Sequence, residues 1–327
     1  ENELKALHST SLPDKNRQLQ QQTSIDTTTE EAVLRSIDTY CLDRHWMMHV
    51  GPQKGKVVKE FLSQCMDTHF QDTHDDVTPC PSTNNMKSKK SFVAVELGTY
   101  CGYSSILLVQ KAKQYIMEQQ LHKEEASSTS SLFHLYTVEV DPTHVNIARN
   151  LIRLAQLEDF ITVLELCPGK TTLNELLQEN IPTSSSSSSS TCSRPSPSSP
   201  RQQPENKNEP LHNQVTYNND HHTPHPIDFL FVDHDKDLYL SDLQHLEQTG
   251  WIQAGTYVAA DNVIFAQIDN YREYVQTLSQ KGIVQTRLED AQIEYCEPEQ
   301  QQQQQQDQDN IFRDGIEFTI YEKDPLA

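Results

Sequence analysis

Two apolar segments that end in acidic or amide side chains carry the strongest chemical signal in the sequence. They are Ile227–Lys236 (IDFLFVDHDK) and Thr256–Asn262 (TYVAADN). Continuous apolar runs of this kind are typical of buried parallel strands, whose carboxyl ends hold ligands in open α/β sheets. We therefore expect Asp233, Asp261 and Asn262 to converge at one edge of a sheet.

These side chains have the chemistry of a site for a hard divalent cation. Oxygen ligands suit Mg²⁺, which takes few protein ligands and keeps positions for water and substrate. Lys236 follows Asp233 by three positions and would overhang the ion as a base. The structural alternatives are a helix-capping aspartate, a surface lysine and a turn asparagine. We favour a metal-assisted active site with Asp233, Asp261 and Asn262 as ligands.

A second signal predicts a nucleoside-binding turn. The segment Glu96–Gly102 (ELGTYCG) follows an apolar run and precedes a helical pattern, but its two glycines do not form the dinucleotide fingerprint. Glu139 closes the next apolar segment, where an acid can accept hydrogen bonds from ribose hydroxyls. A packing turn and a solvated glutamate are the alternatives. Without a phosphate cradle, the pattern favours a ligand that lacks pyrophosphate, such as S-adenosylmethionine.

The elements that must position these residues alternate between strands and helices. We expect strands at 92–97, 133–139, 161–166, 227–232 and 256–260, and helices near 30–45, 53–69, 103–118, 142–155, 171–179, 238–249 and 269–280. Three further strands are expected at 283–288, 292–295 and 316–321. The alternation predicts an α/β fold with a parallel sheet wrapped by helices, closed by an antiparallel hairpin. The N-terminal helices would cover one face.

Low-complexity segments interrupt this pattern. Ser184–Ser190 is a serine run and Gln300–Gln306 a polyglutamine tract. Such polar segments cannot bury enough apolar surface to offset chain entropy, so we expect them to be disordered. The prediction is a disordered segment at 1–27 and a single domain at 28–327, with inserts at about 72–90, 122–131, 181–226 and 298–310.

Composition excludes several classes of partner. The formal net charge of −21 argues against binding nucleic acid or anionic membranes, and no run is apolar enough to span a bilayer. The 7 cysteines are scattered without paired metal spacing, which favours a reducing, cytoplasmic compartment. Because the sequence begins with Glu1, an upstream leader or anchor stays open. We expect a monomer.

Four motifs in order resemble catechol O-methyltransferases, which are cation-dependent enzymes that use S-adenosylmethionine. The motifs are Trp46–Lys56 (WMMHVGPQKGK), Glu96–Ser104 (ELGTYCGYS), Asp233–Lys236 (DHDK) and Ala260–Ile264 (ADNVI). The resemblance covers about 31–322 without the inserts. It implies a methyltransferase domain of the Rossmann-like class I type, with a seven-stranded mixed sheet.

The resemblance also implies roles for matching positions. Cofactor contacts would come from Met48, His49, Val50, Glu96, Gly98, Tyr100, Ser104, Glu139 and Asp233. Asp233, Asp261 and Asn262 would bind Mg²⁺. Lys236 would be the general base, and Lys236, Asn262 and Glu294 would contact the substrate, Glu294 through the hydroxyl that is not methylated.

The implied reaction is methyl transfer to one hydroxyl of a catechol or polyphenol. Bound Mg²⁺ chelated by two neighbouring hydroxyls would stabilise the phenolate and fix its orientation. Three departures from the family pattern bear on this: Asp235 replaces a tryptophan of the pocket, Cys167–Thr171 replaces a cofactor turn, and Ala266 replaces a proline. Asp235 and the altered turn motivate an alternative, a catalytically impaired cofactor-binding scaffold or interaction protein.

Overall fold

Seven strands form one sheet in the described part of the chain. The computed structural model describes residues 28–44, 47–75, 91–120, 129–182, 225–292 and 313–326. The strand order is β3-β2-β1-β4-β5-β7-β6. The strands are β1 Phe92–Leu97, β2 Phe133–Glu139, β3 Ile161–Glu165, β4 Phe229–Val232, β5 Tyr257–Ala260, β6 Val284–Gln292 and β7 Arg313–Tyr321.

The first five strands pair in parallel and the last two are antiparallel. β1 lies between β2 and β4, while β7 pairs antiparallel with both β5 and β6. This arrangement confirms the predicted α/β sheet with its C-terminal hairpin. One detail was wrong: β6 continues without interruption through Gln292, where separate strands at 283–288 and 292–295 were expected. Residues 293–295 lie outside the described part.

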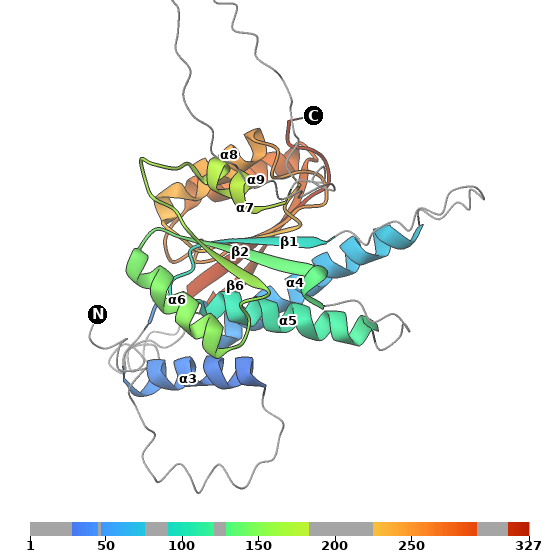
Figure 1. Cartoon of the computed structure of the whole chain (residues 1–327). Coiled ribbons are helices and arrows are strands. Elements are labelled where there is room, and N and C mark those ends of the chain that lie inside the picture. The colour runs from blue at the N-terminus through green and yellow to red at the C-terminus, as the bar shows by residue number, and fades with distance from the viewer. Residues whose placement is uncertain are drawn as a thin grey trace, which may run out of the picture.

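Helices cover both faces of the sheet (Figure 1). On one face lie α3 Thr29–Asp43, α4 Gly51–Asp75, α5 Tyr103–Gln120 and α6 Pro142–Leu154; on the other lie α7 Leu173–Asn180, α8 Tyr239–Gln248 and α9 Asp269–Gln280. Strand side chains alternate between these two cores: Phe229 and Phe231 enter the first, Leu230 and Val232 the second. The N-terminal helices share one face, as predicted.

Local capping explains where several helices begin. The Thr28 hydroxyl accepts a hydrogen bond from the Glu31 N–H at the start of α3, and Asp141 caps α6 ahead of Pro142. Thr172 and Glu175 form a reciprocal capping box at α7. Two segments expected to be inserts carry regular structure, since α4 continues to Asp75 and 129–131 form a short 3₁₀ helix.

The register brings the ends of four parallel strands to the same edge. Leu97 pairs with Val138 on one side and with Val232 on the other, and Val232 pairs with Ala260. The residues that follow these positions, Gly98, Glu139, Asp233 and Asp261, therefore lie along one edge of the sheet. Because β7 is antiparallel to β5, its first residues reach the same edge.

Two further findings concern the described residues alone. No helix there combines the length and apolar character that a membrane crossing requires. Cys41, Cys65, Cys101 and Cys167 are free thiols. Burial raises the pKa of Cys101 to about 12, which agrees with a packing role for this cysteine and not with a reactive one.

Candidate active site

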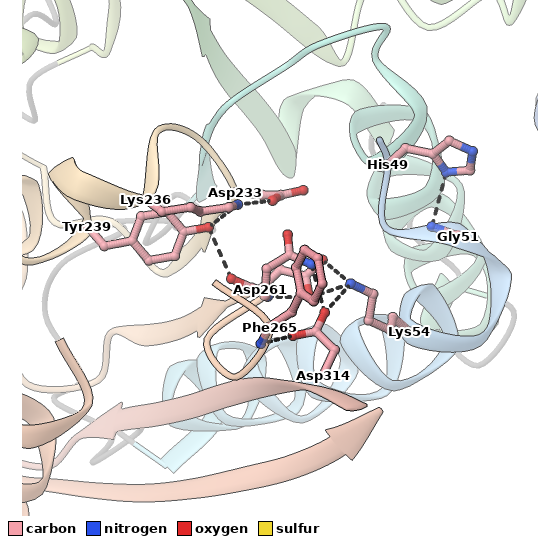
Figure 2. A network of polar contacts seen from close by, with 10 residues as sticks. His49, Gly51, Lys54, Asp233, Lys236, Tyr239, Asp261, Phe265 and Asp314 are labelled. Atoms are coloured by element: carbon pink, nitrogen blue, oxygen red, sulfur yellow. Dashed lines mark hydrogen bonds and ion pairs between the residues drawn. The ribbon is translucent and has the colours of Figure 1, made fainter. Parts of the chain in front are cut away.

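A buried lysine joins two aspartates at the carboxyl edge of the sheet (Figure 2). The Nζ of Lys54, in the first turn of α4, donates to Asp261 Oδ1 at 2.9 Å and Oδ2 at 2.8 Å. It also donates to Asp314 Oδ2 at 3.0 Å. Burial opposes the positive charge, but Asp261 and Asp314 outweigh it and raise the pKa of Lys54. The sequence prediction gave no role to Lys54 or Asp314.

Asn262 is fixed by the same cluster. Its side-chain Nδ2 donates to Asp314 Oδ2 at 2.7 Å, and its backbone N–H donates to Asp261 Oδ1 at 2.8 Å. Its φ of 59° lies in the left-handed region, where asparagine is among the better tolerated residues. Since the amide nitrogen is bound to Asp314, the side-chain oxygen of Asn262 is left to accept from, or ligate, another group.

Lys236 forms a second polar cluster next to the first. Its Nζ donates to Asp233 Oδ1 at 2.8 Å and to the Tyr239 hydroxyl at 2.7 Å. Tyr239 in turn donates to the backbone oxygen of Asp261 at 3.1 Å. Tyr239 thus connects Lys236 and Asp233 to the backbone of Asp261, although the sequence prediction did not include this tyrosine.

The side chains at these strand ends offer oxygen atoms, the kind of donor that a hard divalent cation takes. Asp233 and Asp261 follow paired residues of adjacent strands, and Asn262 comes next. Two carboxylates and an amide are oxygen donors of the kind Mg²⁺ takes alongside water and substrate. Among the described side chains, no three His, Cys, Asp or Glu residues are arranged to hold a metal by themselves. Water and Asn262 would therefore have to complete the shell.

The turn after β1 packs backbone against backbone. Gly98 has φ of 97°, and a Cβ there would lie 2.2 Å from the Asp233 carbonyl oxygen. A side chain at this position would thus push the β1 turn away from the end of β4. Tyr100, at φ 48°, donates its N–H to Glu139 Oε2 at 2.7 Å, which ties the turn to the end of β2.

Glu96 places a carboxyl group with one unused oxygen beneath this turn. It is fully buried; Oε2 accepts from Thr137 at 2.6 Å and from Ser105, while Oε1 has no hydrogen-bond partner in the described structure. Burial raises the pKa of Glu96 to about 7, although the hydrogen bonds from Ser105 and Thr137 oppose the shift. An orphaned buried acceptor suits a cationic donor such as the amino group of S-adenosylmethionine.

Glu139 is held by backbone donors. Its Oε1 accepts from the N–H groups of Val140 at 2.9 Å and Asp141 at 3.0 Å, and its Oε2 from Tyr100. A carboxylate has about four lone-pair positions, so about one remains for a further donor. Contact with both ribose hydroxyls would displace one of the backbone bonds.

The residues just before α4 differ in how far their side chains are exposed. Met48 is 60% exposed, whereas Val50 is buried in the core. The ring of His49 lies 4.2 Å from that of Tyr103, and its Nδ1 accepts the Gly51 N–H at 3.1 Å. Burial and nearby Lys54 lower the pKa of His49 to about 4, so the ring is neutral at physiological pH. Of the three predicted cofactor contacts, Val50 serves core packing.

Of three other positions singled out in the sequence, the structure describes only Asp235. Glu294 and Trp46 lie outside the described residues. Asp235 is exposed and accepts the Asp237 N–H at 3.2 Å, so it caps the short helix η2, Lys236–Leu238, that presents Lys236. Asp314 had no local signal in the sequence, while Lys54 lay within a quoted motif without a role.

Sequence comparison relates the chain to known methyltransferases. It is 26% identical over 250 residues to catechol O-methyltransferase of Bos taurus, covering 75% of this chain and 60% of that protein. It is 24% identical over 246 residues to catechol O-methyltransferase B of Danio rerio, covering 75% of this chain and 61% of that one. The matched region thus spans about three fifths of each relative. The resemblance expected from the four motifs is confirmed.

The other comparisons add less. No family model matches the chain. An O-methyltransferase from Bacillus cereus, solved in complex with SAH, aligns with a TM-score of 0.47 and 17% identity, covering 90% of each chain.

Proposed function

From a sequence related to the catechol O-methyltransferases, we propose that this protein transfers a methyl group from S-adenosylmethionine to one hydroxyl of a catechol-type vicinal diol. The observation that carries the proposal is the juxtaposition of Asp233 and Lys236 with Asp261 and Asn262, beside the glycine turn after β1. Such a cluster would offer a basic side chain and oxygen ligands to one bound ion.

The cofactor assignment is supported by the surroundings of the turn. The bound cofactor would supply an electrophilic methyl group. The partnerless oxygen of Glu96 would accept from its amino group, and Glu139 would accept from a ribose hydroxyl. Gly98 lets the chain pass close to β4 without a side chain in the way. Ser104 and Tyr100 belong to the same segment. Met48 and His49 precede α4, and the His49 ring packs against Tyr103.

The metal assignment follows from the donors that remain. Asp233 gives Oδ1 to Lys236 and keeps Oδ2, while Asn262 keeps its side-chain oxygen. These oxygens would hold Mg²⁺ together with Asp261, whose two carboxylate oxygens also accept hydrogen bonds from Lys54. The ion would chelate both hydroxyls of the diol and stabilise the phenolate, whose ordinary pKa lies near 10.

Lys236 is the proposed general base. Its amine would accept the proton of the hydroxyl that attacks, as the oxygen bonds to the methyl carbon and the carbon–sulfur bond breaks. Glu294, predicted from the sequence, would accept a hydrogen bond from the second hydroxyl. Selectivity for vicinal diols over simple phenols then follows from chelation.

The test is methyl transfer to a panel of catechols and simple phenols, with and without EDTA. We expect transfer to vicinal diols alone, lost on chelation and restored by Mg²⁺. Lys236→Ala should lower kcat by about 10²- to 10⁴-fold, the usual contribution of general base catalysis. The matched control is Lys281→Ala, an exposed lysine at the end of α9.

Turnover that is indifferent to both EDTA and Lys236→Ala would rule this mechanism out. Calorimetric binding of S-adenosylhomocysteine without turnover of any diol would instead favour the scaffold alternative.

A further inference from the structure

Tyr239 has a buried hydroxyl between the proposed base and a proposed metal ligand. The residue opens α8 and is fully buried. Its oxygen lies 2.7 Å from Lys236 Nζ and 3.1 Å from the backbone oxygen of Asp261. Figure 2 shows this path from Lys236 through Tyr239 to Asp261.

The direction of both hydrogen bonds is fixed by chemistry. A carbonyl oxygen accepts and cannot donate, so the phenol proton belongs to the bond with Asp261. The phenol oxygen is then left to accept from Lys236. The two hydrogen bonds therefore run in one direction, from the Lys236 amine to the phenol oxygen and from the phenol to the Asp261 carbonyl oxygen.

Lys236 thus has two fixed acceptors, the Asp233 carboxylate at 2.8 Å and the Tyr239 hydroxyl. A neutral amine has two hydrogens and one lone pair in tetrahedral directions. If both hydrogens are bound, the lone pair is confined to the remaining direction. If the Tyr239 proton were not committed to Asp261, it would instead compete for that lone pair.

We propose that Tyr239 is a positioning residue whose hydroxyl directs the lone pair of Lys236 toward the substrate and ties the amine to the backbone that carries Asp261. The inference rests on the proposed function and names a residue that acts through the base. Since Tyr239 would contact the base and neither the substrate nor the cofactor, it is not itself a catalytic residue.

The tyrosine ring is held independently of its hydroxyl. It stacks on His234 at 5.1 Å between centroids, and His234 is bound to Asp242 at 2.9 Å. The edge of Tyr271 packs against it at 5.9 Å. Phenylalanine at position 239 would keep these ring contacts, so Tyr239→Phe removes the two hydrogen bonds with little change in packing.

The structure also provides a matched control. Tyr271 is fully buried beside Tyr239, and its hydroxyl has no hydrogen-bond partner in the described structure. Tyr271→Phe therefore removes the same group from the same core without touching Lys236.

The experiment compares kcat and KM for a catechol, and the Kd of S-adenosylhomocysteine, in the unaltered protein, Tyr239→Phe and Tyr271→Phe. We expect Tyr239→Phe to lower kcat about 10- to 100-fold, because the amine would lose one of the two acceptors that orient its lone pair toward the substrate. KM and the cofactor Kd should stay within about twofold. Tyr271→Phe should match the unaltered protein in all three.

Two results would overturn the inference while leaving the proposed function intact. One is full turnover by Tyr239→Phe. The other is a loss shared equally between kcat, KM and cofactor binding, which indicates a structural role alone. If the unaltered protein transfers no methyl group to any diol, the proposed function fails and the inference fails with it.

Discussion

Glu96 shows how one buried side chain couples protonation to stability. The carboxyl group belongs to β1 and has its Oε1 unpartnered in the described structure. Burial disfavours the ionised form, so the pKa rises from 4.5 to about 7 despite the hydroxyl donors Ser105 and Thr137. In the absence of cofactor, the folded state therefore prefers the protonated acid across a range in which the unfolded chain is already ionised.

The sign of the resulting pH dependence follows from linkage. A raised carboxyl pKa gives stability that is present below about pH 4.5 and is lost as pH rises through about 7. We expect the unfolding free energy of the cofactor-free protein, relative to Glu96→Gln, to fall by up to about 1.4 kcal/mol per pH unit within this window. Urea unfolding from pH 5 to 8 measures it.

The Gln variant is its own control, since it cannot ionise at this position. Parallel stability curves for the two proteins would show that Glu96 does not titrate in this range. In that case the carboxyl would already be ionised and compensated in the folded protein.

At the scale of elements, Lys54 connects three segments of the fold. It stands on α4, Asp261 follows β5 and Asp314 lies at the start of β7. All three side chains are almost fully buried, with Lys54 at 4% exposure. In such a buried ionic cluster the opposite charges compensate each other. Removal of one member leaves charge in an environment that cannot solvate it.

We expect Lys54→Met to lower the unfolding free energy by about 3–5 kcal/mol, because Asp261 and Asp314 would lose their shared counter-charge. Mg²⁺ should recover part of this loss if it binds near Asp261, since it would replace the missing positive charge. Urea unfolding with and without Mg²⁺ measures both effects.

Lys56→Met is the matched control on the same helix, because Lys56 is exposed. It should change the unfolding free energy by less than about 0.5 kcal/mol. Equal behaviour of the two variants would mean that the Lys54 cluster does not hold these elements together.

For the molecule as a whole, a long low-complexity segment lies in the sequence between α7 and β4. Ile181, just after α7, and Ile227, just before β4, are buried in the same core. The chain thus leaves and re-enters one packed layer on either side of the serine-rich sequence. We therefore propose that the segment interrupts one domain and does not separate two.

Replacing residues 184–224 by a short Gly-Ser linker should therefore preserve both fold and transfer activity. The unfolding free energy should stay the same or rise by about 1–2 kcal/mol, because a shorter loop has less entropy to lose. Urea unfolding and the catechol assay measure the two properties. Loss of either would show that the segment makes contacts the site needs.

The sequence was sufficient for the elements and for the residues at their ends. Apolar runs of strand length, Thr and Asp caps, and a proline at the first turn of α6 are local signals. The succession of strands and helices along the chain, and the residues at which helices begin, could therefore be predicted from them. Asp233, Asp261 and Asn262 could be expected together because the carboxyl ends of parallel strands share an edge. The uninterrupted β6 was missed because its polar residues hide a strand that pairs with β7.

The partners of those residues came from the tertiary structure. Lys54 and Asp314 are 260 positions apart, and no local period relates them. Their contact depends on how α4 packs against the sheet and on the antiparallel entry of β7. In the sequence, nothing distinguishes Tyr239 from an ordinary residue at the start of a helix. Its contact with the Asp261 carbonyl oxygen is seen only in the tertiary structure. Local patterning encodes which side chains end each strand, whereas long-range packing selects the groups that hold and orient them.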